Sequence, residues 1–240
     1  MLSTESFTGD SMPQRWSAMA PAATLGRRRV PVPDASASLL VVDVQNGFVT
    51  GGCLAVPRGE EVVPVINRIA PAFVNAVLTQ DWHPAGHASF ASSHPGKQPY
   101  DSAELGYGAQ VLWPDHCVQG TADAALHADL SVPQAQLIVR KGFHAGVDSY
   151  SAFQEADRRT PTGLDGYLRQ RGISRLFITG LATDFCVSWT ALDACRLGYD
   201  TWVVEDATRA IDLDGSLDAA WREMEAGGVG RMLAADISVA

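Results

Sequence analysis

From residue 38 onward, short apolar runs alternate with stretches of helical periodicity. The apolar runs fall at residues 39–42, 73–78, 137–139, 176–179 and 202–204. Each run is too short for a typical helix, and its apolar residues follow one another instead of alternating with polar ones. Such runs are typical of strands that are buried on both faces of a parallel sheet. A last short strand is expected around residues 229–233.

Three intervening segments repeat apolar residues at a spacing of three or four, which places them on one face of a helix. They are Val62, Val63, Ile66 and Ile69; Val187, Ala191 and Cys195; and Leu217, Ala220, Trp221 and Met224. Helices that connect parallel strands pack on the faces of the sheet. The pattern therefore predicts an α/β fold, in three α-β-α layers, with a mainly parallel central sheet of about six strands.

The chain of 240 residues suits one sizeable domain, and it contains no internal repeat. Residues 1–36 carry Ser, Thr, Pro and Ala and a basic run at residues 27–29, without sustained periodicity. We expect residues 1–36 to be a poorly ordered N-terminal extension and residues 37–240 to form the domain. Two long connections, residues 47–57 and 89–115, are rich in turn residues and are expected to wall a site.

Composition narrows the classes of function. Lys and Arg total 18 against 27 Asp and Glu, a formal net charge of −9, which argues against a surface for nucleic acids or anionic membranes. The four cysteines form no CxxC pair, no apolar run could span a bilayer, and the N-terminus lacks the features of a secretory signal. We expect a cytoplasmic protein with reduced thiols, either a monomer or a homo-oligomer.

Polar residues lie at the carboxyl ends of several predicted strands. Asp43, Asp81 and Lys141 each follow an apolar run, and the run that ends at residue 179 leads to Cys186. Taken singly, such an Asp is commonly a turn former, a Lys a solvated charge and a Cys a small buried hydrophobe. Because ligands bind at the carboxyl edge of open α/β sheets, four such residues on one edge indicate a site.

Cys186, Lys141 and Asp43 together have the chemistry of acyl transfer. A thiol near a helix N-terminus feels the positive end of the helix dipole, which favours the thiolate, and the ammonium of Lys141 would favour it further. Asp43 can take the thiol proton and return it to a leaving amine. Backbone N–H groups in the turn before Cys186 can hold an oxyanion, and no GxSxG elbow points to a serine hydrolase. The predicted intermediate is a thioester.

A second set of residues has the ligand types of a divalent metal site. Asp81 and His83 are two residues apart, so on an extended segment their side chains point the same way. His116 is a candidate third ligand, and His87 is either a fourth ligand or a group behind the ligands. Oxygen and imidazole ligands suit Zn²⁺, Fe²⁺ or Mn²⁺. On spacing alone, polar loop histidines are the better explanation, and Cys117 beside His116 is expected only to pack.

Six short segments share a pattern with one known family. They are VVDVQNGF at residues 41–48, QDWHP at 80–84, WPDHCV at 113–118, KG at 141–142, VDSYSAF at 147–153 and GLATDFCV at 180–187. From about residue 39 to the C-terminus, the chain resembles the nicotinamidase branch of the isochorismatase-like hydrolases. The Asp, Lys and Cys set marks the amidases of that superfamily in general. QDWHP and WPDHCV are the more specific signs of the nicotinamidase branch.

The resemblance implies a role for each matching residue. Cys186 would be the nucleophile, Asp43 its base, and Lys141 the charge that lowers the thiol pKa. The peptide bond between Leu181 and Ala182 would be cis, and the N–H groups of Ala182 and Cys186 would hold the oxyanion.

The resemblance also implies a metal beside the nucleophile. Asp81, His83 and His116 would bind one divalent ion, Zn²⁺ before Fe²⁺ or Mn²⁺, with His87 as a ligand that the family uses less uniformly. The metal would bind a pyridine nitrogen, directly or through water. The aromatic residues that correspond to the walls around the ring are Phe48, Trp113 and Tyr150, of which Tyr150 is better explained as ordinary core.

The activity implied is hydrolysis of nicotinamide to nicotinate and ammonia in NAD salvage, with pyrazinamide accepted too because it keeps a ring nitrogen and the carboxamide. Two other interpretations stay open. One is a carbamoyl or ureido amidase of the same superfamily, whose members generally lack the metal triad. The other is a non-catalytic module with a structural metal. The presence of Cys186 disfavours an isochorismatase. Phe185 departs from the family, where His or Tyr is common, as does the N-terminal extension.

Overall fold

The computed structural model describes residues 30–237, so the basic run and most of the expected N-terminal extension lie outside the described residues. The core is an open sheet of six strands in which every neighbouring pair is parallel. In the order in which they lie side by side, the strands are β5 (Ala135–Lys141), β2 (Asn75–Asp81), β1 (Ala37–Val42), β6 (Arg175–Leu181), β7 (Asp200–Arg209) and β8 (Gly230–Met232).

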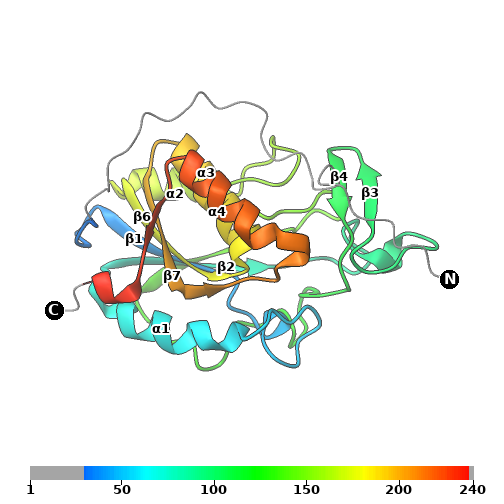
Figure 1. Ribbon diagram of the computed structural model, residues 1–240, viewed down its shortest axis with the longest axis horizontal. Coiled ribbons are helices and arrows are strands. Elements are labelled where there is room, and N and C mark those ends of the chain that lie inside the picture. Colours follow the sequence, from blue (N-terminus) through cyan, green and yellow to red (C-terminus); the bar gives the residue numbers. More distant parts are fainter. Residues whose placement is uncertain (1–29, 238–240) are drawn as a thin grey trace.

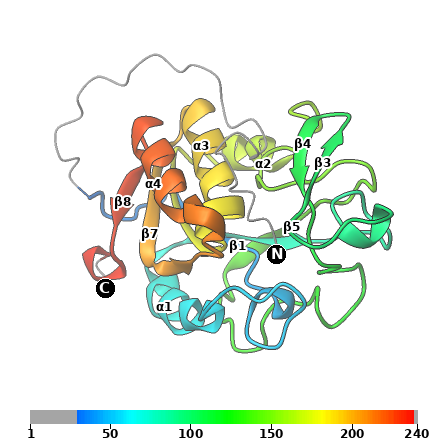
Figure 2. The same ribbon diagram turned by 45° about the vertical axis from the view of Figure 1, so that its right-hand side comes forward.

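Helices cover both faces of this sheet. Helix α1 lies on one face, whereas α2, α3 and α4 lie on the opposite face (Figures 1 and 2). The predicted three-layer fold is therefore confirmed. The α-helices are α1 (Val62–Ile69), α2 (Leu164–Gln170), α3 (Ser188–Arg196) and α4 (Ser216–Ala226). Short 3₁₀ turns lie at Asn46–Phe48, Gly59–Glu61, Ala70–Ala72, Ala91–Ser93, Leu213–Gly215 and Ala234–Asp236. No helix within residues 30–237 is long and apolar enough to cross a membrane.

Burial explains why continuous apolar runs form the central strands. All residues of β1, and all but the first residues of β2 and β6, are buried. The edge strand β5 differs, because its more buried positions alternate with exposed ones such as Ile138, which is 48% exposed. A strand with helices on both faces and strands on both sides has no position at which a polar residue reaches water.

Two elements were not expected from the sequence. An antiparallel hairpin, β3 (Ser102–Leu105) and β4 (Gly108–Val111), lies within the long connection at residues 89–115. Most of its residues are only partly buried, so no apolar run marks it. Helix α2 is short and contains Gly166, a residue that weakens a helical pattern.

The order of the strands reverses between β1 and β6. From β1 the chain continues to β2 and β5 on one side, while β6 lies on the other side of β1 and leads to β7 and β8. Such a reversal opens a crevice at the carboxyl ends of the strands, where α/β proteins bind ligands. At this point Gly180 of β6 has a φ of +108°, and a Cβ there would come within 1.9 Å of the Val42 carbonyl oxygen. Glycine therefore allows β6 to lie this close to β1.

Candidate active site

Neighbouring strands bring the predicted site residues to one edge of the sheet. Asp43 follows β1 directly, and Asp81 and Lys141 are the last residues of β2 and β5, where they are paired in register. The ladder thus includes Asp81 and Lys141 instead of ending just before them. Strand β6, on the other side of β1, leads into the turn that carries Cys186.

Cys186 lies in a turn of π-helix, Thr183–Val187, which continues into α3. The preceding peptide bond between Leu181 and Ala182 is cis, at the position for which the resemblance implies a cis bond. Single π turns occur frequently at functional sites. The sulfur therefore comes to the sheet edge at the start of a helix, with the residue only 7% exposed.

The ammonium of Lys141 lies at the centre of the group. Its Nζ donates to Sγ of Cys186 at 3.3 Å, to the carbonyl oxygen of Ser149 at 2.8 Å, and to Oδ1 of Asp81. Oδ2 of Asp43 lies 2.8 Å from the same nitrogen. An ammonium has three N–H donors, and those three acceptors use them all. Oδ2 of Asp43 is therefore paired with Lys141 in charge but has no hydrogen-bond partner.

Burial and mutual charge shift the pKa values of this group. Burial raises the pKa of the Cys186 thiol well above its usual range, and although Lys141 opposes this, Asp43 and Asp81 reinforce it. Lys141 thus acts on the thiol pKa in the expected direction, while burial and the two carboxylates act against it. Burial also raises the pKa of Asp43, against the charge of Lys141. Burial lowers the pKa of Lys141, but Asp43 and Asp81 outweigh it, so the group remains an ammonium.

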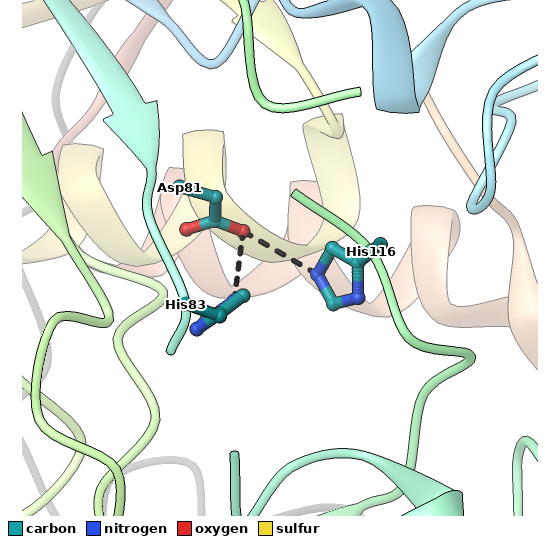
Figure 3. A group of neighbouring side chains, drawn as sticks. All are labelled: Asp81, His83 and His116. Atoms are coloured by element: carbon teal, nitrogen blue, oxygen red, sulfur yellow. Dashed lines mark ion pairs between the residues drawn. The ribbon is translucent and has the colours of Figure 1, made fainter. Parts of the chain in front are cut away.

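Asp81, His83 and His116 point their side chains toward one another (Figure 3). Oδ2 of Asp81 lies 3.5 Å from Nε2 of His83 and 3.6 Å from Nε2 of His116. All three residues are buried, and their ligand atoms lie within 4.8 Å of one another. Burial would raise the pKa of Asp81, but Lys141 and His83 hold it well below its usual range. One carboxylate and two imidazoles that face a common point are a donor set for a divalent metal.

Backbone carbonyl groups orient both imidazole rings. Nδ1 of His83 lies 3.1 Å from the carbonyl oxygen of Gly142, and Nδ1 of His116 lies 2.8 Å from that of Pro114. Because a carbonyl oxygen only accepts, Nδ1 carries the proton of each neutral ring and Nε2 keeps its lone pair. Nε2 of His83 is buried without a hydrogen-bond partner. That arrangement is the one expected of a metal ligand.

His87 lies behind the group of three. Its ring packs against His83 with the two centroids 4.3 Å apart. Its Nε2 lies 3.1 Å from the carbonyl oxygens of His144 and Val147, and its Nδ1 lies 2.7 Å from the hydroxyl of Ser89. Both ring nitrogens therefore have partners, and His87 supports the ring of His83 in this arrangement.

The candidate metal ligands Asp81, His83 and His116 are called the metal group below. The sulfur of Cys186 and two members of this group share one pocket, whose walls are mainly apolar. Cys186, Asp81 and His116 line it together with the three aromatic residues that the resemblance implies, Phe48, Trp113 and Tyr150. The other lining residues are Leu54, Asp148, Ala182, Phe185 and Ile211.

The contacts of two aromatic residues of the pocket bear on how they are interpreted. Tyr150 is only 5% exposed, as core residues are, yet it lines the pocket, and its hydroxyl accepts hydrogen bonds from Trp113 Nε1 at 3.0 Å and Gln110 Nε2 at 2.8 Å. The interpretation of Tyr150 as ordinary core is therefore incomplete. Phe185, which the resemblance marks as a departure from the family, packs its ring edge-on against Trp113 at a centroid distance of 4.9 Å.

Sequence reasoning gave no role to three residues that support the site. Thr79 of β2 donates a hydrogen bond to Oδ1 of Asp43 at 2.5 Å, Ser149 accepts one from Lys141, and Asp148 lines the pocket. Asp148 and Ser149 lie in the VDSYSAF segment, in which only Tyr150 was given a role. The available signal for Thr79 was a hydroxyl at the end of a buried apolar run, on the same face as Asp81 two residues later.

Comparison with known proteins extends this result. A family model described as the isochorismatase domain matches residues 37–236. The nicotinamidase of Acinetobacter baylyi is 58% identical over 202 residues, which cover 84% of this chain and 94% of that protein.

Solved structures agree with the sequence comparison. A nicotinamidase/pyrazinamidase from Acinetobacter baumanii superposes with a TM-score of 0.84 and 59% identity, covering 85% of this chain and 98% of that one. The pyrazinamidase of Pyrococcus horikoshii in complex with zinc superposes with a TM-score of 0.67 and 33% identity, over 82% of this chain and 99% of that one. The family match covers all six strands of the sheet, the residues around Cys186 and the candidate metal ligands. This chain therefore belongs to the isochorismatase family.

Proposed function

We infer that this protein is a nicotinamidase, an amidohydrolase that converts nicotinamide to nicotinate and ammonia and that also hydrolyses pyrazinamide. The observation that carries this inference is the sulfur of Cys186, which lies 3.3 Å from the ammonium of Lys141 in a pocket lined by aromatic rings. Such a pocket suits a flat heteroaromatic ring with a carboxamide aimed at the thiol. The identity to the nicotinamidase of Acinetobacter baylyi supports the same activity.

We propose that the reaction passes through a thioester. Sγ of Cys186 attacks the carboxamide carbon while its proton passes to Asp43, and the N–H groups of Ala182 and Cys186 stabilise the charge on the carboxamide oxygen. Asp43 then gives the proton to the amide nitrogen, the C–N bond breaks and ammonia leaves. A water molecule attacks the thioester and gives a proton to Asp43. The C–S bond breaks, the proton on Asp43 returns to the sulfur, and the product is nicotinic acid, which loses its remaining acidic proton to solvent as nicotinate.

In this scheme Lys141 balances the charge that moves between sulfur and carboxylate. Burial raises the pKa of the Cys186 thiol and Lys141 lowers it, so the ammonium eases the transfer of the proton from the sulfur. The ammonium faces both partners, with Sγ at 3.3 Å and Oδ2 of Asp43 at 2.8 Å. It can therefore stabilise the negative charge on either side of the transfer without moving.

We propose that Asp81, His83 and His116 hold one divalent ion, Zn²⁺ before Fe²⁺ or Mn²⁺. The donor set fits such an ion, because Nε2 of His83 is a buried nitrogen without a hydrogen-bond partner and faces Oδ2 of Asp81. When bound, the ion would supply a Lewis acid that anchors a ring nitrogen, directly or through water. His87 would have to leave its present partners to become a ligand, so we assign it a supporting role.

Two features favour this function over its rivals. A carbamoyl or ureido substrate has no ring nitrogen. An ion held by the carboxylate and imidazole groups of the pocket would then have no ring nitrogen of the substrate to anchor. A non-catalytic metal module would not need a thiol, a carboxylate and an ammonium in contact beside the metal group. We place the reaction in NAD salvage in the cytoplasm, which agrees with the four cysteines, none of which forms a disulfide.

Ammonia release from nicotinamide, pyrazinamide and an N-carbamoyl amino acid tests the proposal. We expect the first two to be hydrolysed and the third to be hydrolysed poorly. Cys186→Ala should reduce nicotinamide turnover to traces while the protein stays folded. Cys195→Ala, at a second cysteine that lies in α3, should keep wild-type turnover. Substantial turnover by folded Cys186→Ala would refute the thioester route, and a preference for the carbamoyl substrate would refute the assigned activity.

A further inference from the structure

The two carboxylate oxygens of Asp43 have different surroundings. Oδ1 accepts a hydrogen bond of 2.5 Å from the hydroxyl of Thr79. Oδ2 is buried, lies 2.8 Å from Nζ of Lys141 and has no hydrogen-bond partner. The three N–H donors of Lys141 go to Asp81, Ser149 and Cys186. A hydroxyl donor thus holds Oδ1 in place, whereas Oδ2 faces the Lys141 ammonium beside the sulfur.

The hydroxyl of Thr79 also holds the backbone of Asp43. Asp43 has a φ of 48°, a conformation that residues other than glycine seldom adopt. There β1 leaves its ladder, and the backbone N–H of Asp43 donates instead to the Thr79 hydroxyl at 3.1 Å. One hydroxyl thus accepts from the backbone of Asp43 and donates to its side chain. Because Thr79 is fully buried in β2, beside β1, the hydroxyl is held by the sheet itself.

We propose that Thr79 is a positioning residue that fixes Asp43 so that Oδ2, and not Oδ1, takes the proton from Cys186. This inference rests on the proposed function, because it assigns the atom that acts as base in that reaction. Without the hydroxyl, the Asp43 carboxylate can rotate about its last bond, and Oδ1 becomes a second buried oxygen in need of a donor. The interactions of the Lys141 ammonium would then be divided differently between the Asp43 carboxylate and the Cys186 sulfur.

A purely structural role for Thr79 would lower stability without changing the thiol. The test therefore needs variants that remove the hydroxyl, one that restores it, and a matched control. Thr79→Val and Thr79→Ala remove it, and Thr79→Ser keeps it. Thr179→Val is the control, because Thr179 is equally buried, lies beside the other edge of β1 and donates to the Leu40 carbonyl oxygen at 3.3 Å.

For each variant, kcat and KM for nicotinamide, bound zinc and the rate of Cys186 alkylation by iodoacetamide are measured, with the labelled cysteine identified by mass spectrometry. We expect Thr79→Val and Thr79→Ala to lower kcat about 10- to 100-fold, with KM within about twofold, since a positioned base contributes roughly 100-fold or more. Alkylation of Cys186 should slow about tenfold in both, with zinc content unchanged. Thr79→Ser and Thr179→Val should remain near wild type.

Wild-type kcat and alkylation rate in folded Thr79→Val or Thr79→Ala would overturn the proposal. If Thr79→Val does not fold, Thr79→Ala decides the question alone. Loss of zinc together with activity would also overturn it, because the effect would then act through Asp81, two residues along β2. If the wild-type protein does not hydrolyse nicotinamide, the proposed function fails, but the alkylation rates still test the role of Thr79.

Discussion

Among the single residues of the site, Asp81 links the surroundings of Cys186, the proposed nucleophile, to the candidate metal ligands His83 and His116. Its Oδ1 accepts a hydrogen bond from Lys141, while its Oδ2 faces Nε2 of His83 and of His116. One carboxylate therefore takes part in both charge networks. Substitution of Asp81 would disturb the thiol and the metal site together, so the metal site has to be tested through other residues.

Gly142 is such a residue, because it leaves the space that the His83 ring occupies. Its φ is +63°, and a Cβ at this position would lie 2.4 Å from Cε1 and 2.5 Å from Nδ1 of His83. We expect Gly142→Ala to displace the ring and to weaken zinc binding about 10- to 100-fold, as loss of a group that orients a ligand typically does. Zinc titration with a competing chelator measures this.

Gly146→Ala is the control, because Gly146 follows in the same loop and a Cβ there would meet nothing within 4 Å. It should bind zinc as the wild type does. If Gly142→Ala bound zinc as tightly as the wild type, His83 would not bind the metal with its ring in the present orientation.

Among the elements, two loops that wall the pocket are held by one carboxylate. Oδ1 of Asp123 accepts the backbone N–H of Cys53 at 3.1 Å, and Oδ2 accepts that of Cys117 at 2.7 Å. The carbonyl oxygen of Asp123 accepts the N–H of Gly47 at 2.8 Å. The first loop carries the pocket residue Leu54 next to Cys53, and the second carries the candidate metal ligand His116 next to Cys117.

We therefore expect Asp123→Asn to loosen both loops, because the amide would direct N–H groups at one of the two backbone donors. The free energy of unfolding should fall by about 1 kcal/mol, because the hydrogen bond to Cys117 is partly buried and the one to Cys53 is exposed. KM for nicotinamide should rise more than kcat falls, because the two loops that wall the pocket move while the sulfur of Cys186 keeps its position. Denaturant unfolding and steady-state kinetics measure the two effects.

The same exchange at an exposed position, Asp129→Asn, should change neither quantity. If Asp123→Asn kept both the stability and the KM of the wild type, the two loops would be held by other contacts.

In the whole molecule, the site depends on the point at which the strand order reverses. Asp43 follows β1 and Cys186 follows β6, the two strands on either side of that point, while Lys141 reaches across from the edge strand β5. The metal group joins Asp81 at the end of β2 to His116 in a loop before β5. An ion held there would tie that loop to the sheet.

Metal removal should therefore lower the stability of the whole domain as well as its activity. At an ion concentration a thousandfold above the Kd, binding stabilises a folded protein by about 4 kcal/mol, and a chelator should remove that contribution. We expect a lower Tm and slower nicotinamide hydrolysis after chelation, with both restored by zinc. Calorimetry and the ammonia assay measure these changes.

His116→Ala should unfold at the same temperature with and without the chelator, because it lacks a ligand. A wild-type Tm and activity that do not respond to chelation would refute the metal site, while the thioester route would stand.

The sequence alone determined the fold class, the sheet edge and the residue types of the site. Apolar runs and helical spacing depend on burial within a few neighbouring residues, so they predict elements without knowledge of their contacts. The segments around Asp43, Asp81, Lys141 and Cys186 then indicated the family by resemblance. The hairpin β3–β4 was not predicted, because its partly buried residues leave no such run.

Only the tertiary structure decided how these groups share their charges and protons. The thiol pKa depends on the burial of Cys186 and on the distances to two carboxylates and one ammonium, all set by strands remote in sequence. The same holds for the ion pair of Asp43 with Lys141, for the hydrogen bond of Thr79 to Asp43 and for the partners of His87. Electrostatic and hydrogen-bond energies change within an ångström, and strand register and loop packing set distances on that scale.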